Sequence, residues 1–255
     1  MKVAVIQTSL TWENQQVNCA RFEKLIKTHK VAADIILLPE MFSTGFTMKP
    51  EAVAETMDGE TVMWMKKLAA AKNCAIAGSV VITEKGNYYN RFLFVMPDGE
   101  IESYDKRHLF TLAGENKAYT NGADRLVIEY RGWKICPLVC YDLRFPVFSR
   151  NTEDIDLLLY AANWPAPRVL AWDTLLRARA IENMCYVAGV NRIGQDINGH
   201  HYPGHSQVFD YLGTSLTMPS EEEEVITVEL DKQSMLETRK KFDFLSDRDT
   251  FILQG

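Results

Sequence analysis

Short apolar runs rich in β-branched residues alternate along the chain with longer segments in which apolar residues recur at helical spacing. The runs predict strands and the longer segments predict helices, a pattern that is typical of layered α/β structure. We expect strands over residues 2–8, 34–39, 74–82, 88–96, 101–105, 125–130, 133–140, 157–163, 185–191, 206–211 and 223–230. We expect helices over residues 14–30, 59–73, 169–183 and 231–242.

The beginning of the chain illustrates this pattern. Within residues 14–30, the apolar positions Val17, Ala20, Leu25 and Ile26 fall roughly on one helical face. Because apolar runs precede and follow this segment, the sequence predicts a β-α-β start.

Turn sequences separate several of the expected strands. The segment 97–100 (PDGE) predicts a hairpin, 131–132 a second turn, and 198–199 a turn between two further strands. A loop is expected from about 111–123. No internal repeat or Pro/Gly-rich linker divides the chain, and we expect one domain over residues 1–255.

The charge and the apolar runs limit the possible partners. The formal net charge is -6, which leaves no basic excess for binding a nucleic acid or an anionic membrane. The apolar runs fall short of the roughly 20 residues that cross a bilayer, and the N-terminus lacks a secretory signal pattern. We therefore expect a cytoplasmic protein that binds neither nucleic acid nor membrane.

The cysteines and histidines do not predict a metal site. The five cysteines are scattered without close pairs, and an odd count in such a chain favours reduced thiols. His200, His201 and His205 lie close together, but no Asp, Glu or Cys completes a familiar ligand spacing. We expect no bound metal.

Several apolar runs end in one reactive polar residue. Glu40, Cys140, Asn163 and Asn191 each follow such a run directly. The C-terminal ends of strands in layered α/β folds meet at a common crevice, so these side chains are expected to share a pocket. A carboxylate in apolar surroundings needs a partner, and Lys106 is the candidate.

Cys140 lies where an apolar run changes abruptly into a polar turn. Such an elbow exposes the sulfur and directs the following backbone N–H groups, especially that of Tyr141, at the group under attack. A free thiol has a pKa of roughly 8.5 and needs a base or a cation nearby to react at neutral pH. Glu40 is the candidate base and Lys106 the candidate cation. The alternative is a buried structural cysteine, the state expected for Cys136.

Three motifs in series resemble the Glu, Lys and Cys motifs of the nitrilase (carbon-nitrogen hydrolase) superfamily. They are LPEMF around Glu40, YDKRHLF around Lys106 and VCYDLRFP around Cys140. The segments VAVIQ, RAIENMCYVAGVNR and GHSQVFD extend the resemblance over nearly the whole chain, and AANWPAPR and NRFLFV are similar to the bacterial omega-amidase branch. One departure is Val147, where many relatives carry Glu. Arg144, in the third motif, is expected to brace the elbow rather than touch substrate.

The resemblance implies an α-β-β-α sandwich in a single domain, usually dimerised through one helical layer. It implies that Glu40, Lys106 and Cys140 hydrolyse a small amide through a cysteine thioester, without a metal or cofactor. A second family glutamate falls on Glu115, which is expected to orient Lys106 or the substrate amide. The expected partners are a small-molecule amide and a second copy of the chain in a homodimer.

The omega-amidase branch implies short 2-oxo dicarboxylic monoamides, such as 2-oxoglutaramate and 2-oxosuccinamate, as substrates. Arg168 is expected to bind the substrate carboxylate through two parallel hydrogen bonds, with a surface salt bridge as the alternative. The other expected pocket residues are Tyr141, Asn163, Trp164 and Phe46. Nitriles and N-carbamoyl amines are alternative substrates of the same thiol chemistry. A non-catalytic small-molecule-binding homologue is the alternative of a different class.

Overall fold

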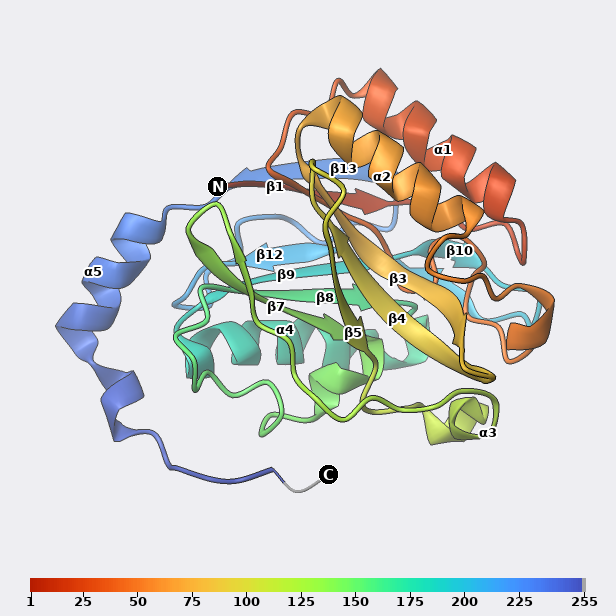
Figure 1. The fold of residues 1–255 in the computed structure, drawn as a ribbon. Helices are drawn as coiled ribbons and strands as arrows, with labels where there is room; N and C mark the ends of the chain where they lie inside the picture. Colours follow the sequence, from red (N-terminus) through yellow and green to blue (C-terminus); the bar gives the residue numbers. More distant parts are fainter. Residues whose placement is uncertain (254–255) are drawn as a thin grey trace.

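Two β-sheets packed face to face, with helices on both outer faces, form the body of the computed structural model (Figure 1). The structure describes residues 1–253. Residues 254 and 255, which belong to the expected domain, lie outside the described residues.

The first sheet has six strands, and its centre is parallel. β1 and β2 pair in parallel, as do β2 and β3, whereas the flanking strands pair antiparallel. The β4–β5 pair is the hairpin that the PDGE turn predicts. In spatial order the strands are β13 (Glu224–Glu229), β1 (Lys2–Gln7), β2 (Ile35–Leu37), β3 (Ala75–Glu84), β4 (Asn87–Val95) and β5 (Ile101–Asp105).

The second sheet has five strands with a parallel centre formed by β7, β8 and β9. In spatial order the strands are β12 (Gln207–Phe209), β9 (Tyr186–Asn191), β8 (Leu157–Ala162), β7 (Trp133–Val139) and β6 (Ile128–Tyr130). A separate hairpin, β10 (Ile193–Gln195) and β11 (His201–Pro203), confirms the turn expected at 198–199.

The alternation of side chains along each strand divides the core into layers. On β1, Val3 and Val5 belong to the core between the two sheets, whereas Ala4 and Ile6 pack with the helices outside. Successive residues of a strand point to opposite faces, so a fully apolar strand contributes to both layers at once. This is why the central strands read as continuous apolar runs.

Three helices cover the outer faces. α1 (Gln15–Thr28) and α2 (Glu60–Lys72) lie on the six-stranded sheet, and α4 (Val169–Asn183) lies on the five-stranded sheet (Figure 1). The approach of α4 to β9 is close. A Cβ atom added at Gly189 of β9 would lie 2.6 Å from Leu176 Cδ1 of α4.

The expected buried face of the first helix is wrong in part. Val17 is 44% exposed and Ala20 is exposed as well. The polar residue Asn18 is buried instead, because its side-chain amide donates hydrogen bonds to two loop carbonyls at 2.7 and 2.8 Å. The residues that face the sheet are Asn18, Phe22, Leu25 and Ile26.

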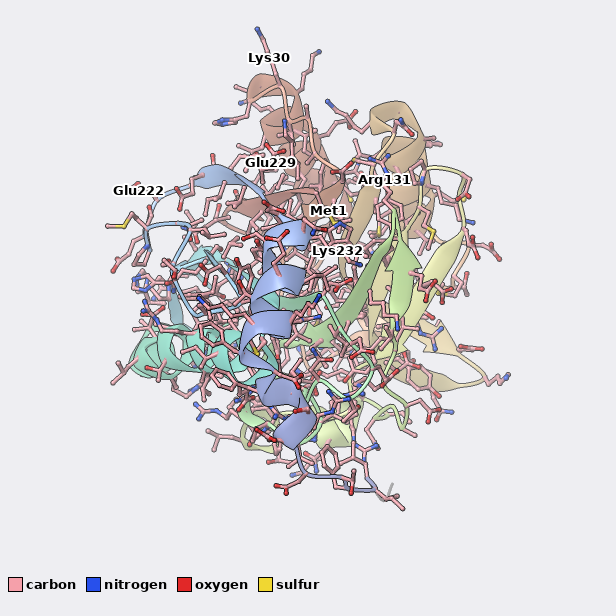
Figure 2. All side chains as sticks on the ribbon, turned by 90° about the vertical axis from the view of Figure 1, so that its left-hand side faces the viewer. Met1, Lys30, Arg131, Glu222, Glu229 and Lys232 are labelled. Atoms are coloured by element: carbon pink, nitrogen blue, oxygen red, sulfur yellow. The ribbon has the colours of Figure 1, made fainter. Side chains whose placement is uncertain are left out.

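α5 (Lys232–Phe242) closes the chain at one side of the sandwich, and Figure 2 shows it from the front with Lys232 at its beginning. Lys232 Nζ lies 2.6 Å from the carboxylate of Asp156, which ties the helix to the body. None of the helices in residues 1–253 has the length and apolar character needed to span a membrane.

Candidate active site

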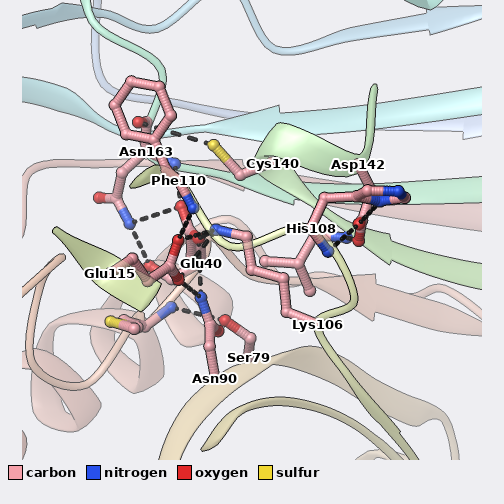
Figure 3. A network of polar contacts seen from close by, with 12 residues as sticks. Glu40, Ser79, Asn90, Lys106, His108, Phe110, Glu115, Cys140, Asp142 and Asn163 are labelled. Atoms are coloured by element: carbon pink, nitrogen blue, oxygen red, sulfur yellow. Dashed lines mark hydrogen bonds and ion pairs between the residues drawn. The ribbon is translucent and has the colours of Figure 1, made fainter. Parts of the chain in front are cut away.

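Strands of both sheets deliver the expected site residues to one place (Figure 3). Lys106 directly follows β5, and Glu40 lies shortly after β2, both in the six-stranded sheet. Cys140 directly follows β7, and Asn163 directly follows β8, both in the five-stranded sheet. Of the four polar residues expected to meet at strand ends, Glu40, Cys140 and Asn163 do so, and Lys106 joins them as the expected partner of Glu40.

The ammonium of Lys106 lies between two carboxylates. Lys106 Nζ is 2.8 Å from Glu40 Oε1, and it is 3.0 and 2.9 Å from the two carboxylate oxygens of Glu115. The side chains of all three residues are fully buried. Buried charges need partners of opposite sign. Lys106 is the partner of both carboxylates, and they are its partners.

Glu115 begins α3 (Glu115–Ala118), a short helix within the segment that the sequence analysis treats as a loop. The backbone N–H of Phe110 donates to Glu115 Oε2 at 2.6 Å, which fixes the carboxylate from the other side. Glu115 therefore orients Lys106 through a direct contact, one of the two roles expected of it.

The cluster shifts the proton affinities of its members. Burial by itself lowers the pKa of Lys106, but the charges of Glu115 and Glu40 outweigh it and raise that pKa above its ordinary value. Burial raises the pKa of Glu115 although Lys106 opposes the shift. Lys106 is therefore a permanent cation at neutral pH.

Cys140 has the left-handed backbone conformation of a sharp elbow, with φ of 45°. Its Sγ lies 3.8 Å from the backbone carbonyl oxygen of Asn163. Burial, followed by the charge of Glu40, raises the pKa of the thiol well above its ordinary value, and Lys106 opposes this. The resting thiol is thus protonated, and a base has to remove the proton before the sulfur can attack. Cys136 is fully buried in the core, as expected.

Asp142 braces the elbow from inside. Its buried carboxylate accepts hydrogen bonds from the backbone N–H of Val139 at 2.9 Å and from the hydroxyl of Tyr104 at 2.8 Å. The backbone N–H of His108 also donates to it at 3.1 Å. Asp142 therefore joins the elbow to the strand before it and to the segment that carries Lys106.

A pocket of ≈ 760 Å³ opens above Cys140. Lys106 and Cys140 line this pocket, together with the five residues that were expected to bind substrate. Phe46 is one of them, and the centre of its ring lies 5.3 Å from Lys106 Nζ. The five are Phe46, Tyr141, Asn163, Trp164 and Arg168.

Two guanidinium groups face the pocket. That of Arg168 lies over the ring of Phe110 and that of Arg144 over the ring of Trp164, each 5.0 Å from the ring centre. Within residues 1–253, neither arginine has an ion-pair partner. Arg144, which was expected to brace the elbow rather than touch substrate, lines the pocket instead, and the buried carboxylate of Asp142 braces the elbow.

Asn191 does not line the pocket, contrary to the expectation. Its side chain donates to the carbonyls of Trp164 and Gly204 at 2.9 and 2.8 Å and accepts from the Trp164 N–H at 2.7 Å. It therefore holds the segment that carries Trp164. The β10–β11 hairpin supplies Asp196, His200 and Tyr202 to the pocket wall. The sequence pattern gave no sign of this contribution.

Sequence reasoning also missed Asn90. It is a fully buried polar residue in the apolar strand β4, and its side chain contacts both Glu40 and Glu115. A polar residue inside an apolar run is the same kind of signal that singled out Glu40. Two of the histidines considered as metal ligands lie outside the cluster of Glu40, Lys106 and Glu115. His200 contacts Asp196, and His205 contacts Asp173.

Comparison with known proteins agrees with this geometry. The model of the carbon-nitrogen hydrolase family matches residues 2–240, and the chain belongs to that family. The fold expected from the resemblance is confirmed by the XC1258 protein of Xanthomonas campestris, described as a CN-hydrolase superfamily protein with an arsenic adduct in the active site. Its crystal structure superposes with a TM-score of 0.97 at 43% identity and covers 100% of this chain and 99% of that one.

Among curated relatives, "Omega-amidase YafV" of Yersinia enterocolitica is 46% identical and the alignment covers 99% of this chain and 98% of that protein. The "2-oxoglutaramate amidase" of Bacillus subtilis (strain 168) is 32% identical, with 96% of each chain covered. The resemblance to the omega-amidase branch is thus confirmed over nearly the full length.

Proposed function

We propose that this protein is an omega-amidase, which hydrolyses the terminal amide of small 2-oxo dicarboxylic monoamides to the dicarboxylate and ammonia. The observation that carries the proposal is the joint placement of Cys140, Glu40 and Lys106 beneath a pocket. The pocket also presents two guanidinium groups that have no ion-pair partner among residues 1–253. The relative named omega-amidase supports the reaction class, and the relative named 2-oxoglutaramate amidase supports 2-oxoglutaramate as a substrate. The second proposed substrate, 2-oxosuccinamate, follows from the family resemblance.

In the first half of the reaction, Glu40 takes the proton of the Cys140 thiol and the thiolate attacks the amide carbon. Lys106 and the backbone N–H of Tyr141 stabilise the negative oxygen of the tetrahedral intermediate. The carbon–nitrogen bond then breaks, the nitrogen takes the proton from Glu40, and ammonia leaves behind a thioester.

In the second half, Glu40 takes a proton from a water molecule, and the hydroxide attacks the thioester carbon. The carbon–sulfur bond breaks, the acid product leaves, and the proton returns from Glu40 to the sulfur. Glu115 acts by holding Lys106 in place throughout. Covalent catalysis divides one difficult step into two easier ones.

The substrate carboxylate binds at the arginines. Arg168 presents a planar set of donors that matches a carboxylate, and Arg144 supplies a second cation nearby. Phe46 and Trp164 form apolar walls for the carbon chain, and Asn163 lies beside the reacting amide.

The remaining features of the proposal follow the family resemblance. One domain over residues 1–255 carries the activity without a cofactor, in a cytoplasmic homodimer.

Ammonia release from a panel of ω-monoamides, nitriles and N-carbamoyl amines tests the function. We expect 2-oxoglutaramate and 2-oxosuccinamate to give the highest kcat/KM, with an acyl-enzyme on Cys140 detectable by mass spectrometry. Cys140→Ala should lower kcat by about 10⁴-fold or more, because the nucleophile is lost.

Cys19→Ala is the matched control, since Cys19 is a partly exposed thiol of α1 away from the pocket. It should retain full activity. Undiminished turnover by Cys140→Ala would contradict the mechanism, and preference for a nitrile or a carbamoyl amine would contradict the substrate class. Absence of turnover across the panel would favour a binding protein.

A further inference from the structure

The two oxygens of the buried Glu40 carboxylate have different donors. Oε1 accepts hydrogen bonds from Lys106 Nζ and from Asn90 Nδ2, both at 2.8 Å. Oε2 accepts from the backbone N–H of Asn163 at 2.9 Å and, over a longer distance of 3.4 Å, from the side-chain nitrogen of the same residue. The backbone carbonyl of Asn163 contacts Cys140 Sγ. Asn163 therefore contacts both Oε2 and the sulfur.

Asn90 holds three members of the cluster at once. Its side-chain nitrogen donates to Glu40 Oε1 at 2.8 Å and to Glu115 Oε1 at 3.1 Å. Its backbone carbonyl accepts from the backbone N–H of Lys106 at 3.0 Å. Asn90 does not line the pocket, so it acts on the reaction through these neighbours.

The other end of the Asn90 amide shows that this orientation has a cost. Asn90 Oδ1 is buried and has no hydrogen-bond partner in the part of the chain that the structure describes. Leaving a buried acceptor unpaired is unfavourable. Turning the amide over would be worse, because Oδ1 would then face two carboxylates. The orientation with both N–H bonds toward Glu40 and Glu115 is the one that suits two ionised groups.

We propose that Asn90 is a positioning residue for the hydrolysis. Together with Lys106 it binds Oε1 of Glu40 through two short hydrogen bonds, whereas Oε2 has one short hydrogen bond and one long contact, both from Asn163, and is the oxygen that exchanges the proton with Cys140. In that exchange the bond from sulfur to hydrogen breaks as the bond from Oε2 to hydrogen forms, and the reverse transfer closes the cycle. The assignment rests on the mechanism proposed above and deepens it.

A neutral donor suits this position for an electrostatic reason. Among the described titratable groups whose pKa Glu40 influences, Lys106 is the cation. A neutral amide stabilises the ionised carboxylate without adding a second positive charge that would hold the proton away from it. The groups concerned are Lys106, Glu115, Cys140, Tyr119 and Tyr202.

Asn90→Ala tests the assignment by separating binding from proton transfer. We expect kcat for 2-oxoglutaramate to fall about tenfold or more, because a hydrogen bond to a charged group is lost. KM should change by less than about threefold, since no pocket contact is removed. The acid limb of the kcat/KM profile should move to higher pH, because the carboxylate that accepts the Cys140 proton loses a hydrogen-bond donor.

The rate of Cys140 alkylation by iodoacetamide, followed by peptide mass spectrometry against pH, gives a second readout that needs no substrate. The acid limb of this profile should move in the same direction. If it moves while no ω-monoamide is hydrolysed by the unmodified protein, the substrate proposal fails and the role of Asn90 stands. If both profiles stay in place, the role of Asn90 is refuted whatever the substrate.

Asn151→Ala is the matched control. Asn151 is also a fully buried asparagine, and its amide donates to the carbonyls of Ile155 and Asn183 at 3.0 Å, outside the pocket. It should lower the melting temperature and leave both pH profiles unmoved. Asn90→Asp, which keeps the shape but adds a third carboxylate, carries the test if Asn90→Ala does not fold. Asn90→Asp with the kcat and pH profile of the unmodified protein would overturn the proposal.

Discussion

Each of the two arginines that line the pocket packs against an aromatic ring. The guanidinium of Arg168 lies over the ring of Phe110 and that of Arg144 over the ring of Trp164. Such cation–π contacts restrict the positions that the two side chains can adopt, and a guanidinium can bind a carboxylate through two parallel hydrogen bonds. An anion that enters the pocket therefore meets two cations supported by aromatic rings.

Arg168→Met should raise KM for 2-oxoglutaramate by about tenfold to a hundredfold, because a charged hydrogen-bonding partner of the carboxylate is removed. The effect on kcat should be small, since the change is remote from the sulfur. Steady-state kinetics of ammonia release measures both. A neutral amide without a carboxylate is the control substrate, and its KM should not change. Equal losses for both substrates would show that Arg168 supports the pocket rather than the carboxylate.

The sequence predicts those site residues whose role can be inferred from their neighbours along the chain. Glu40 and Cys140 stand out because each ends an apolar run, and Lys106 because a buried carboxylate needs a cation. Arg144 could not be placed in the same way, because its direction depends on Trp164, which follows a different strand. Asn90 carries a visible signal, but its two partners become neighbours only in the folded chain.

Among the elements, the elbow after β7 depends on one internal carboxylate. Asp142 accepts hydrogen bonds from Val139 and from two residues of the segment that carries Lys106. Burial, followed by the charge of Asp142, raises the pKa of its partner Tyr104 well above the ordinary value. The elbow is thus stabilised by the carboxylate of Asp142, which is fully buried.

Asp142→Asn should lower the free energy of unfolding by about 3 kcal/mol, since a buried charged acceptor with several donors is lost. It should also lower kcat, because the sulfur is no longer held in one position. Urea unfolding and steady-state kinetics measure the two effects. Asp231→Asn is the matched control: Asp231 caps α5 by accepting from Ser234 N at 3.1 Å, and asparagine caps equally well. Comparable losses in the two variants would contradict the special role of Asp142.

The sequence predicts the elements well where their signal is periodic. The expected helix at 169–183 coincides with α4. The face of α1 was wrong because Asn18 is buried by hydrogen bonds to a loop that the helix pattern does not contain. α3 was not expected, because a helix of four residues has little local signal and depends on the distant ion pair of Glu115 with Lys106.

On the scale of the whole molecule, the separation of the layers is set by side-chain volume. α4 approaches β9 so closely that Gly189 has no room for a methyl group, with Leu176 and Trp172 directly above it. A larger residue there would push the helix from the sheet.

Gly189→Ala should lower the free energy of unfolding by about 1–3 kcal/mol, as is usual for overpacking. The sign is informative, because Gly→Ala changes in unstrained positions stabilise a protein by about 0.4–1 kcal/mol through the unfolded chain. Thermal and urea unfolding measure the effect. In a Leu176→Ala background the same change should cost less, because the methyl group then has space. An unaltered cost there would mean that the layers are not coupled at this contact.

The α/β class and the strand positions were predictable, because apolar runs recur throughout the chain. The order of the strands was not predictable from the pattern, since pairing joins distant segments. β1 pairs with β13, which places Lys2 opposite Glu229. Nothing in either segment identifies the other, and the family resemblance supplied the sandwich.

Glu40 and Lys106 follow strands of one sheet, whereas Cys140 follows a strand of the other. While the two sheets are apart, neither the carboxylate nor the ammonium lies beside the Cys140 thiol, and a free thiol reacts slowly at neutral pH without such a neighbour. The reactive arrangement of the three side chains forms when the two sheets pack together. A newly made chain is therefore expected to hydrolyse amides only after it has folded completely.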